Sequence, residues 1–185
     1  TDGGPDHIDT NREIRRTQLI GGTTGIYKLF DGAWENGLKA QWTEQHAKTF
    51  QDGEFADFGK SVGRKIKLGY HNTIKFNTKD FANSRHTITT GLETENEKAV
   101  TDSFKKSRDQ DGVFGEYQLD IFDKITLTGS GRYDRNDLFE NAKTWRSTAA
   151  YRIDGLGTKF RSSYGTGIKN PTFSELFGGN DDFVP

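Results

Sequence analysis

A short acidic segment, 109–112, is the part of the sequence that most resembles a metal-binding loop. It reads Asp-Gln-Asp-Gly, which is how a calcium loop of the EF-hand type begins. The third acidic ligand and the closing glutamate are missing at the spacing that this loop requires. Asp181 and Asp182 form a second acidic pair that could meet a cation, but charged loop side chains are usually solvated. We therefore predict no metal site.

The four histidines lie far apart, at positions 7, 46, 71 and 86, and the chain has no cysteine. A zinc site or a disulfide framework is therefore not predicted. His46 and His86 could ligate haem or a metal, but isolated histidines on polar faces are usually only solvated. The sequence shows no recognisable catalytic set of a nucleophile, a general base and a residue that orients the base. The sequence predicts neither an enzyme nor a resident cofactor.

The composition is unusual for a soluble domain. Apolar residues make up 31% of the chain and charged residues 29%, whereas soluble domains average about 45–50% apolar residues with glycine counted. Disordered chains are poor in aromatics and strongly charged, but this one has 14 Phe, 6 Tyr, 3 Trp and a net charge of −1. A membrane β-barrel fits, because its polar lumen face and loops dilute a single apolar face. The near-zero charge gives no electrostatic reason to expect nucleic acid binding.

Membrane helices and a leader peptide are not predicted. The longest unbroken apolar run covers only Ala149, Ala150 and Tyr151, whereas a transmembrane helix needs about 20 residues. No charged and then apolar leader begins at Thr1, so we expect that any signal peptide has been removed or is not included.

The segment from Ser61 to Phe76 shows the clearest strand pattern. Its even positions are mostly apolar, and its odd positions are polar or glycine. Side chains alternate between the two faces of a strand, so this period of two predicts one apolar face and one polar face. The even positions are Val62, Arg64, Ile66, Leu68, Tyr70, Asn72, Ile74 and Phe76.

The same alternation recurs along the chain and predicts eight strands. They are long enough to cross a bilayer when tilted. Besides 61–76, the alternating segments are approximately 17–30, 38–43, 88–93, 113–121, 125–133, 145–153 and 159–164. The polar side chains of these strands are expected to form inter-strand ion pairs and hydrogen bonds that line a lumen, namely Glu93, Glu95, Glu116, Asp120, Lys159 and Arg161.

The connections between these strands are predicted to alternate in length. The segments 31–37, 77–84 and 154–157 are short, the connection around Asp123 is very short, 49–60 and 96–111 are long, and 135–142 is intermediate. Short and long connections alternate throughout if the intermediate one is counted as long. Membrane barrels have short periplasmic turns and longer extracellular loops, so odd-numbered strands would descend toward the periplasm. Tyr133, Trp145 and Tyr164 would then lie near the outer membrane surface, and Phe30, Phe76 and Ile153 near the inner one.

Three architectures are compatible with these strands. Eight strands could close a small barrel, or they could form a soluble β-structured binding or adhesin module. We favour a transmembrane segment of a larger antiparallel up-and-down barrel, with 22 strands as the expected total. In complete bacterial barrels both termini usually lie in the periplasm, whereas here the first strand descends and the eighth ascends. No aromatic terminal strand precedes Pro185.

Residues 160–179 read FRSSYGTGIKNPTFSELFGG, which resembles a strand and the following loop in TonB-dependent outer-membrane receptors. Asn170 departs from the usual alanine of this motif. Two weaker similarities precede it, VFGEYQL at 113–119 and LTGSGRYD at 127–134. The resemblance covers roughly 12–183 and is closest to cobalamin-receptor-like members. The matching residues are Arg161, Ser163, Tyr164, Gly165, Thr166, Gly167, Lys169, Pro171, Thr172, Glu175, Leu176, Phe177 and Gly178.

This resemblance implies a receptor in the bacterial outer membrane that takes up a scarce chelate such as cobalamin, a siderophore or haem. The whole of 1–185 would belong to the barrel domain, with the plug domain, the TonB-contacting segment and the C-terminal strands absent. Its partners would be outer-membrane lipid and the chelate, and TonB only through the missing segments. The fragment alone would not transport.

The motif also has a structural interpretation. Gly165 and Gly167 would allow positive φ and a bend where the strand ends. Pro171 would bias Asn170 toward an extended conformation and end the strand pairing. Thr172 and Glu175 would form a capping box for a short helix. We expect this motif to be a structural rim element first and a ligand contact second. Its candidate residues are Tyr164, Gly165, Thr166, Gly167, Lys169, Asn170, Pro171 and Glu175.

Overall fold

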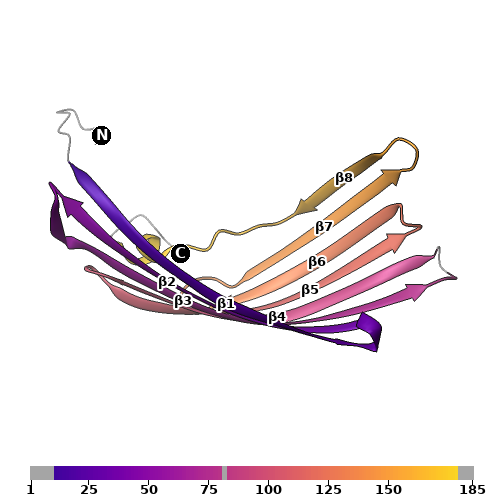
Figure 1. The fold of residues 1–185 in the computed structure, drawn as a ribbon, viewed down its shortest axis with the longest axis horizontal. Coiled ribbons are helices and arrows are strands. Elements are labelled where there is room, and N and C mark those ends of the chain that lie inside the picture. The colour runs from indigo at the N-terminus through magenta and orange to yellow at the C-terminus, as the bar shows by residue number, and fades with distance from the viewer. Residues whose placement is uncertain (1–10, 81–82, 179–185) are drawn as a thin grey trace.

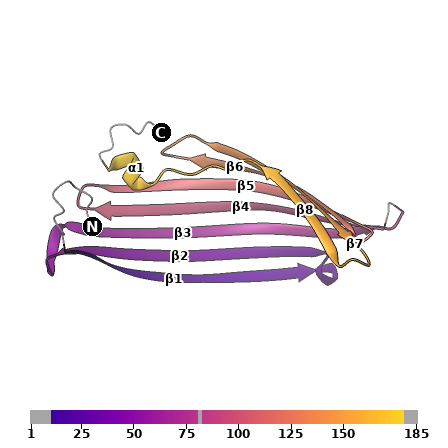
Figure 2. The same cartoon turned by 90° about the horizontal axis from the view of Figure 1, so that it is seen from above.

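The computed structural model describes residues 11–80 and 83–178 as one curved sheet of eight antiparallel strands (Figure 1). Each strand pairs with the next one along the chain, and β1 does not pair with β8, so the sheet is open (Figure 2). The predicted all-β, up-and-down arrangement of eight strands is confirmed. The elements are β1 (Arg12–Leu29), η1 (Phe30–Gly32), β2 (Trp34–Gln51), β3 (Glu54–Thr78), β4 (Ser84–Thr101), β5 (Lys105–Ile121), β6 (Ile125–Asn136), β7 (Ala142–Ile153), β8 (Thr158–Gly165) and α1 (Phe173–Phe177).

One face of this sheet, which we call the apolar face, carries the aliphatic and aromatic side chains. Directly paired residues share a face, so Trp42, Ile66 and Leu68 lie on it together with the other even positions of β3. Ile66 is 42% exposed and Leu68 49%, and Trp145 on β7 is 48% exposed. Among the described residues only Ala142 and Phe173 are buried hydrophobics. The described residues form no second layer over these aliphatic side chains, whereas a soluble sandwich would enclose them between two sheets.

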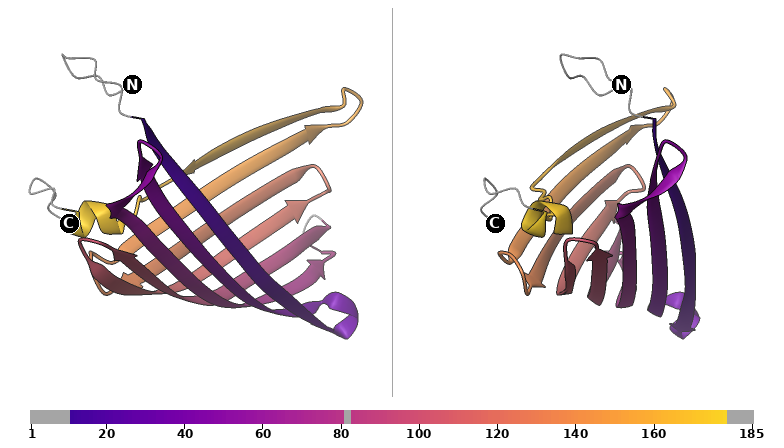
Figure 3. Two further views of the ribbon diagram at one scale, coloured as in Figure 1. Left: turned by 60° about the vertical axis from the view of Figure 1, so that its left-hand side comes forward. Right: turned by 90° about the vertical axis from the view of Figure 1, so that its left-hand side faces the viewer.

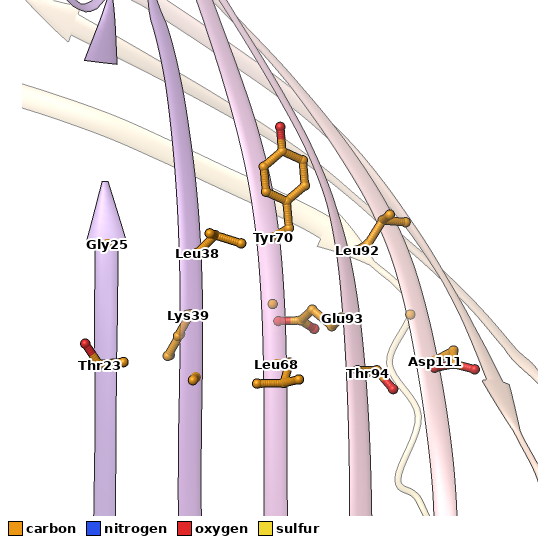
Figure 4. Close-up of a pocket in the computed structure, with 13 residues that line it drawn as sticks. Thr23, Gly25, Leu38, Lys39, Leu68, Tyr70, Leu92, Glu93, Thr94 and Asp111 are labelled. Carbon is orange, nitrogen blue, oxygen red and sulfur yellow. The ribbon is translucent and has the colours of Figure 1, made fainter. Parts of the chain in front are cut away.

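A hollow of about 750 Å³ opens between Leu38, Leu68, Tyr70 and Leu92, which the register places on the apolar face (Figure 4). At one end of it the Tyr70 hydroxyl donates a hydrogen bond to Oδ1 of Asn36 at 2.7 Å. Its surface is predominantly hydrocarbon, in keeping with the rest of this face.

The opposite face, the polar face, is concave. The helix α1 lies on the concave side of the sheet (Figure 3), and its segment contacts the polar-face residue Arg108. Lys65 pairs with Glu95 at 2.5 Å, and Glu93 pairs with both Lys67 at 3.2 Å and Arg132 at 2.6 Å.

The predicted lumen contacts are confirmed in part. The ion pairs of Glu93 and Glu95 are present, and Asp120 accepts hydrogen bonds from Thr126 and Gln118. Glu116, Lys159 and Arg161 form no ion pair with any residue in the described part of the chain.

The predicted long connections at 49–60 and 96–111 are wrong. The strands extend through both segments and leave only 52–53 between β2 and β3 and 102–104 between β4 and β5. Asp52 and Gly53 have φ of 53° and 85°, as a two-residue hairpin turn requires. Side-chain contacts across the strands accompany this extension. The rings of Phe50 and Phe55 pack edge-on with 6.0 Å between their centroids, and Glu97 binds Arg108. The predicted alternation of loop lengths therefore does not exist.

The sheet is taller on one side than on the other. Strands β1 to β5 contain 17 to 25 residues each, whereas β6, β7 and β8 contain 12, 12 and 8. We call the end that carries α1 and the turns at 52–53 and 102–104 the rim end. The end that carries η1 and the turn at 122–124 is the far end. Within 11–80 and 83–178, no helix has the length and apolar content of a membrane span.

Candidate functional site

The residues of the sequence motif form one segment, 164–178, which leaves β8 and returns over the polar face. We call it the rim segment. At its start the ladder with β7 continues beyond the strand, because the Thr166 amide donates to the Trp145 carbonyl at 2.9 Å. The Trp145 amide in turn donates to Oγ1 of Thr166 at 3.1 Å. The Tyr164 ring packs edge-on against Trp145, with 5.5 Å between the ring centroids.

The glycines at this bend do not have the predicted backbone conformation. The described glycines with positive φ are Gly32, Gly53, Gly155 and Gly157, so Gly165 and Gly167 are not among them. Gly165 is needed for a different reason, since a Cβ there would lie 2.5 Å from the Trp145 carbonyl oxygen and 2.9 Å from Cα of Arg146. A Cβ on Gly167 would meet nothing within 4 Å. Close approach of β7 therefore explains Gly165, and no contact explains Gly167.

The capping box predicted for the helix is confirmed. The Glu175 amide donates to Oγ1 of Thr172 at 3.2 Å, and the Thr172 amide donates to Oε2 of Glu175 at 2.7 Å. Lys169 adds an ion pair to the same carboxylate at 2.8 Å. The hydrogen bond from Lys169, followed by those from Thr172, lowers the pKa of Glu175 to about 2. The carboxylate therefore stays ionised and fixes the start of α1.

Arg108 on β5 holds the middle of the rim segment. Its Nη1 donates to the Pro171 carbonyl at 2.6 Å, while Nε donates to Oε2 of Glu97 at 2.8 Å. The guanidinium lies 5.0 Å from the ring centroid of Phe173 and 5.8 Å from that of Phe139. Its side chain is only 13% exposed, so these contacts form a largely desolvated junction.

Asn170, the departure from the usual motif, has a structural role. Its Nδ2 donates to Oε1 of Gln110 at 3.0 Å, and Nε2 of Gln110 donates to Oδ1 of Asp134 at 3.2 Å. Asp134 is bound by Arg132, which also pairs with Glu93. A continuous chain of polar contacts therefore connects the rim segment to the wall, and an alanine at 170 could not make its first contact.

The end of the rim segment packs through aromatic rings. Phe173 is 7% exposed, and the ring of Phe177 lies 6.0 Å from that of Phe104 at the tip of the β4–β5 hairpin. The ammonium of Lys106 lies 4.7 Å from the Phe177 ring centroid. Ile168 is 53% exposed, and the side chain of Lys169 is 79% exposed beside Glu175.

The polar face also contains a hollow of about 420 Å³ beside the rim segment. Its lining includes Phe114, Glu116, Arg132 and Arg146, which come from three neighbouring strands. Glu116 and Arg146 have no ion-pair partner in the described part of the chain, so both charges are free to meet a polar molecule.

The other candidates of the sequence do not come together. Residues 109–112 lie inside β5 and not in a loop, and no group of three or more His, Asp or Glu could hold a metal among the described residues. His46 contacts Glu44, and His86 stacks on Phe76 and contacts the Tyr117 hydroxyl. The register places both histidines on the apolar face, so their predicted polar-face position is wrong. His7, Asp181 and Asp182 lie outside the described residues.

Residues 3–185 match the family model described as TonB dependent receptor-like, beta-barrel. The chain belongs to this family. It is 27% identical to the vitamin B12 transporter BtuB of Vibrio vulnificus (strain CMCP6) over 136 residues, which cover 69% of this chain and 22% of that protein. The crystal structure of the siderophore receptor PirA from Pseudomonas aeruginosa matches with a TM-score of 0.65 at 13% identity, over 88% of this chain and 28% of that one.

These matches identify the sheet as part of the barrel wall of a TonB-dependent receptor. The chain spans only 22% and 28% of the lengths of the two relatives. Arg108 is the residue of this receptor segment that the sequence interpretation missed. A hairpin with its tip at 102–104 would have paired Glu97 with Arg108 and Asn96 with Asp109, as the register does. That complementarity is the signal that could have identified it.

Proposed function

We propose that this chain forms one side of the barrel of an outer-membrane receptor that takes up a scarce chelate with energy supplied through TonB. The observation that carries the proposal is the contrast between the two faces of a single-layered sheet. Exposed aliphatic side chains such as Leu68 suit hydrocarbon tails, and the paired charges of Glu93 and Arg132 suit a wet lumen. Family membership supports the same assignment.

Cobalamin, a ferric siderophore and haem are the chelates that we propose as candidate ligands. The similarity to a vitamin B12 transporter and to a siderophore receptor supports this class without choosing within it. The rim segment would serve mainly to shape the mouth of the barrel. Ile168 and Lys169 are its residues best placed to touch a ligand, since both are exposed.

The whole of 1–185 would be barrel wall, so transport would depend on a plug domain encoded elsewhere in the gene. We expect a strain that lacks the full-length gene to lose growth on one of the three chelates at limiting concentration. The full-length gene would restore it, and a gene encoding only 1–185 would not. Outer-membrane fractionation of the full-length protein checks the location. Unchanged growth of the deletion strain on all three chelates would contradict the proposal.

A further inference from the structure

Two asparagines and a tyrosine form a polar cluster within the apolar face. Asn36 on β2 pairs with Asn72 on β3, and the register places both on the same face as Leu68. The Tyr70 hydroxyl donates a hydrogen bond to Oδ1 of Asn36 at 2.7 Å, and Nδ2 of Asn72 donates to the same oxygen at 3.0 Å. We call Asn36, Tyr70 and Asn72 the amide cluster.

The amide cluster lies inside the part of the face that suits hydrocarbon. The residues of β3 that share this face with Asn72 and flank it on both sides are Ile66, Leu68, Tyr70, Ile74 and Phe76. At about 3.4 Å per residue and a tilt of about 40°, the stretch from Ile66 to Phe76 spans roughly 26 Å of depth, close to the apolar band of about 25 Å on membrane barrels. Asn72 stands four positions before Phe76, so its amide lies well within this band.

The cluster leaves one donor group and one acceptor group unused. An asparagine amide has two N–H bonds and a carbonyl oxygen with two lone pairs. Oδ1 of Asn36 accepts two hydrogen bonds, but Nδ2 of Asn36 donates none to any residue in 11–80 or 83–178. Oδ1 of Asn72 accepts none from the same residues. Hydrocarbon tails cannot hydrogen-bond, so lipid alone leaves both groups unsatisfied.

The two unused groups complement each other. Directly paired residues on adjacent strands lie about 5 Å apart, so the free donor of Asn36 and the free acceptor of Asn72 are neighbours on the surface. A two-fold axis along the membrane normal that passes between them sets Asn36 of each copy against Asn72 of the other. Two hydrogen bonds then form, one in each direction. Both copies keep the same orientation in the membrane, as such an axis requires.

The surface beside the amide cluster permits a close approach. The hollow of about 750 Å³ adjoins Tyr70, and Thr23, Gly25 and Ala40 contribute small side chains to its lining (Figure 4). A Cβ on Gly25 would meet nothing within 4 Å, so the surface is open there. Small residues let protein surfaces approach one another within a membrane, and hydrogen bonds between the chains add to the attraction. This part of the apolar face therefore has room for a second wall.

We propose that the apolar face binds a second copy of the same receptor through the amide cluster and forms a two-fold dimer within the membrane. The deciding contact joins Asn36 of one copy to Asn72 of the other and is made twice. An unrelated membrane protein would need its own matched donor and acceptor at this depth, whereas a second copy carries both. The inference goes beyond the proposed transport function and rests on the proposed membrane location of the barrel.

The test uses the full-length protein in phosphatidylcholine vesicles. Copies labelled with a donor dye and copies labelled with an acceptor dye are mixed, and Förster transfer is measured as the ratio of protein to lipid is lowered. We expect transfer between wild-type copies that falls on dilution as a monomer–dimer equilibrium requires. The double variant Asn36→Leu, Asn72→Leu should raise the dissociation constant roughly tenfold, because two hydrogen bonds are lost in each dimer. An unchanged constant would overturn the inference.

A matched control shows whether the loss is specific to the cluster. Ser147→Leu with Ser162→Leu makes the same polar-to-apolar change on β7 and β8, on the same face of the wall. This control should leave the dissociation constant unchanged, and a tenfold rise in it would overturn the inference. Leucine suits hydrocarbon, so the thermal unfolding midpoint of each double variant in dilute vesicles should equal or exceed that of the wild type.

The single variants test the reciprocal geometry. Two copies of Asn36→Leu, or two copies of Asn72→Leu, lose both hydrogen bonds, whereas a mixed pair keeps the one between its intact asparagines. The mixed pair should therefore associate about threefold more tightly than either variant with itself. Equal association in the three mixtures, or no transfer between wild-type copies, would overturn the inference. Fractionation separates this result from the proposed function, because a protein that reaches the outer membrane and stays monomeric contradicts only the dimer.

Discussion

The five strands β1–β5 and the three strands β6–β8 belong to one sheet, but they end differently at the rim. In the first group β2 to β5 run on to the turns at 52–53 and 102–104, and contacts such as Phe50–Phe55 and Glu97–Arg108 join their ends. In the second group β8 stops at Gly165, and the chain leaves the sheet and docks on β5. The longer strands thus provide the surface, on β5, on which the rim segment docks. The rim segment itself follows β8, the shortest strand.

The largest effect on the docking of the rim segment should come from Arg108→Ala, which removes the contact between β5 and the segment after β8. We expect the rim segment to open more easily by about 2–3 kcal/mol, because a charged hydrogen bond is lost and Glu97 is left without its partner. Hydrogen exchange of the amides of Asn170 and of 172–178 in the full-length protein measures this. Arg64→Ala is the matched control, since its exposed pair should contribute only about 0–1 kcal/mol. Equal protection in the two variants would show that Arg108 does not hold the segment.

A smaller effect is expected from Gly165→Ala, at the point where the short strands end. The added Cβ would press on the Trp145 carbonyl and the Arg146 backbone, and overpacking of this kind costs about 1–3 kcal/mol. Exchange of the Thr166 amide should therefore become faster. Gly167→Ala adds the same methyl group in open space and should change the exchange by less than about 0.5 kcal/mol. Identical results for the two variants would refute close approach as the reason for Gly165.

The smallest effect concerns pH and the start of α1. The pKa of Glu175 is lowered from 4.5 to about 2, so its contribution to the docked segment is complete above about pH 4.5. It is lost as the pH falls through 2, where the carboxylate becomes protonated in the docked segment too. We expect exchange protection of the Glu175 amide to decline over this range in the wild type. In Glu175→Gln the decline should be absent, and an equal decline there would assign the effect to another group.

Local patterns predicted much of this architecture. The alternation around Ile66 predicted both the strand and its faces, and the spacing of Thr172 and Glu175 predicted the capping box, because both depend on neighbours along the chain. The charged ends of β4 and β5 were predicted to be a loop, because charged residues such as Glu97 and Arg108 are usually solvated. In the structure the hairpin pairs these two residues across the strands. The reason for Gly165 and the partner of Asn170 depend on residues 20 and 60 positions away, which alternation cannot predict.

The tie between Arg108 and Pro171 also has a consequence for the order of assembly. It joins residues 63 positions apart, whereas Arg108 and Glu97 are separated by only 11 positions. Closing the shorter loop costs less chain entropy, so the β4–β5 hairpin is expected to form first. The hairpin then provides the surface on which the rim segment docks. The segment after β8 can settle only onto that completed hairpin. It should therefore be the last part of this wall to become ordered as the barrel matures.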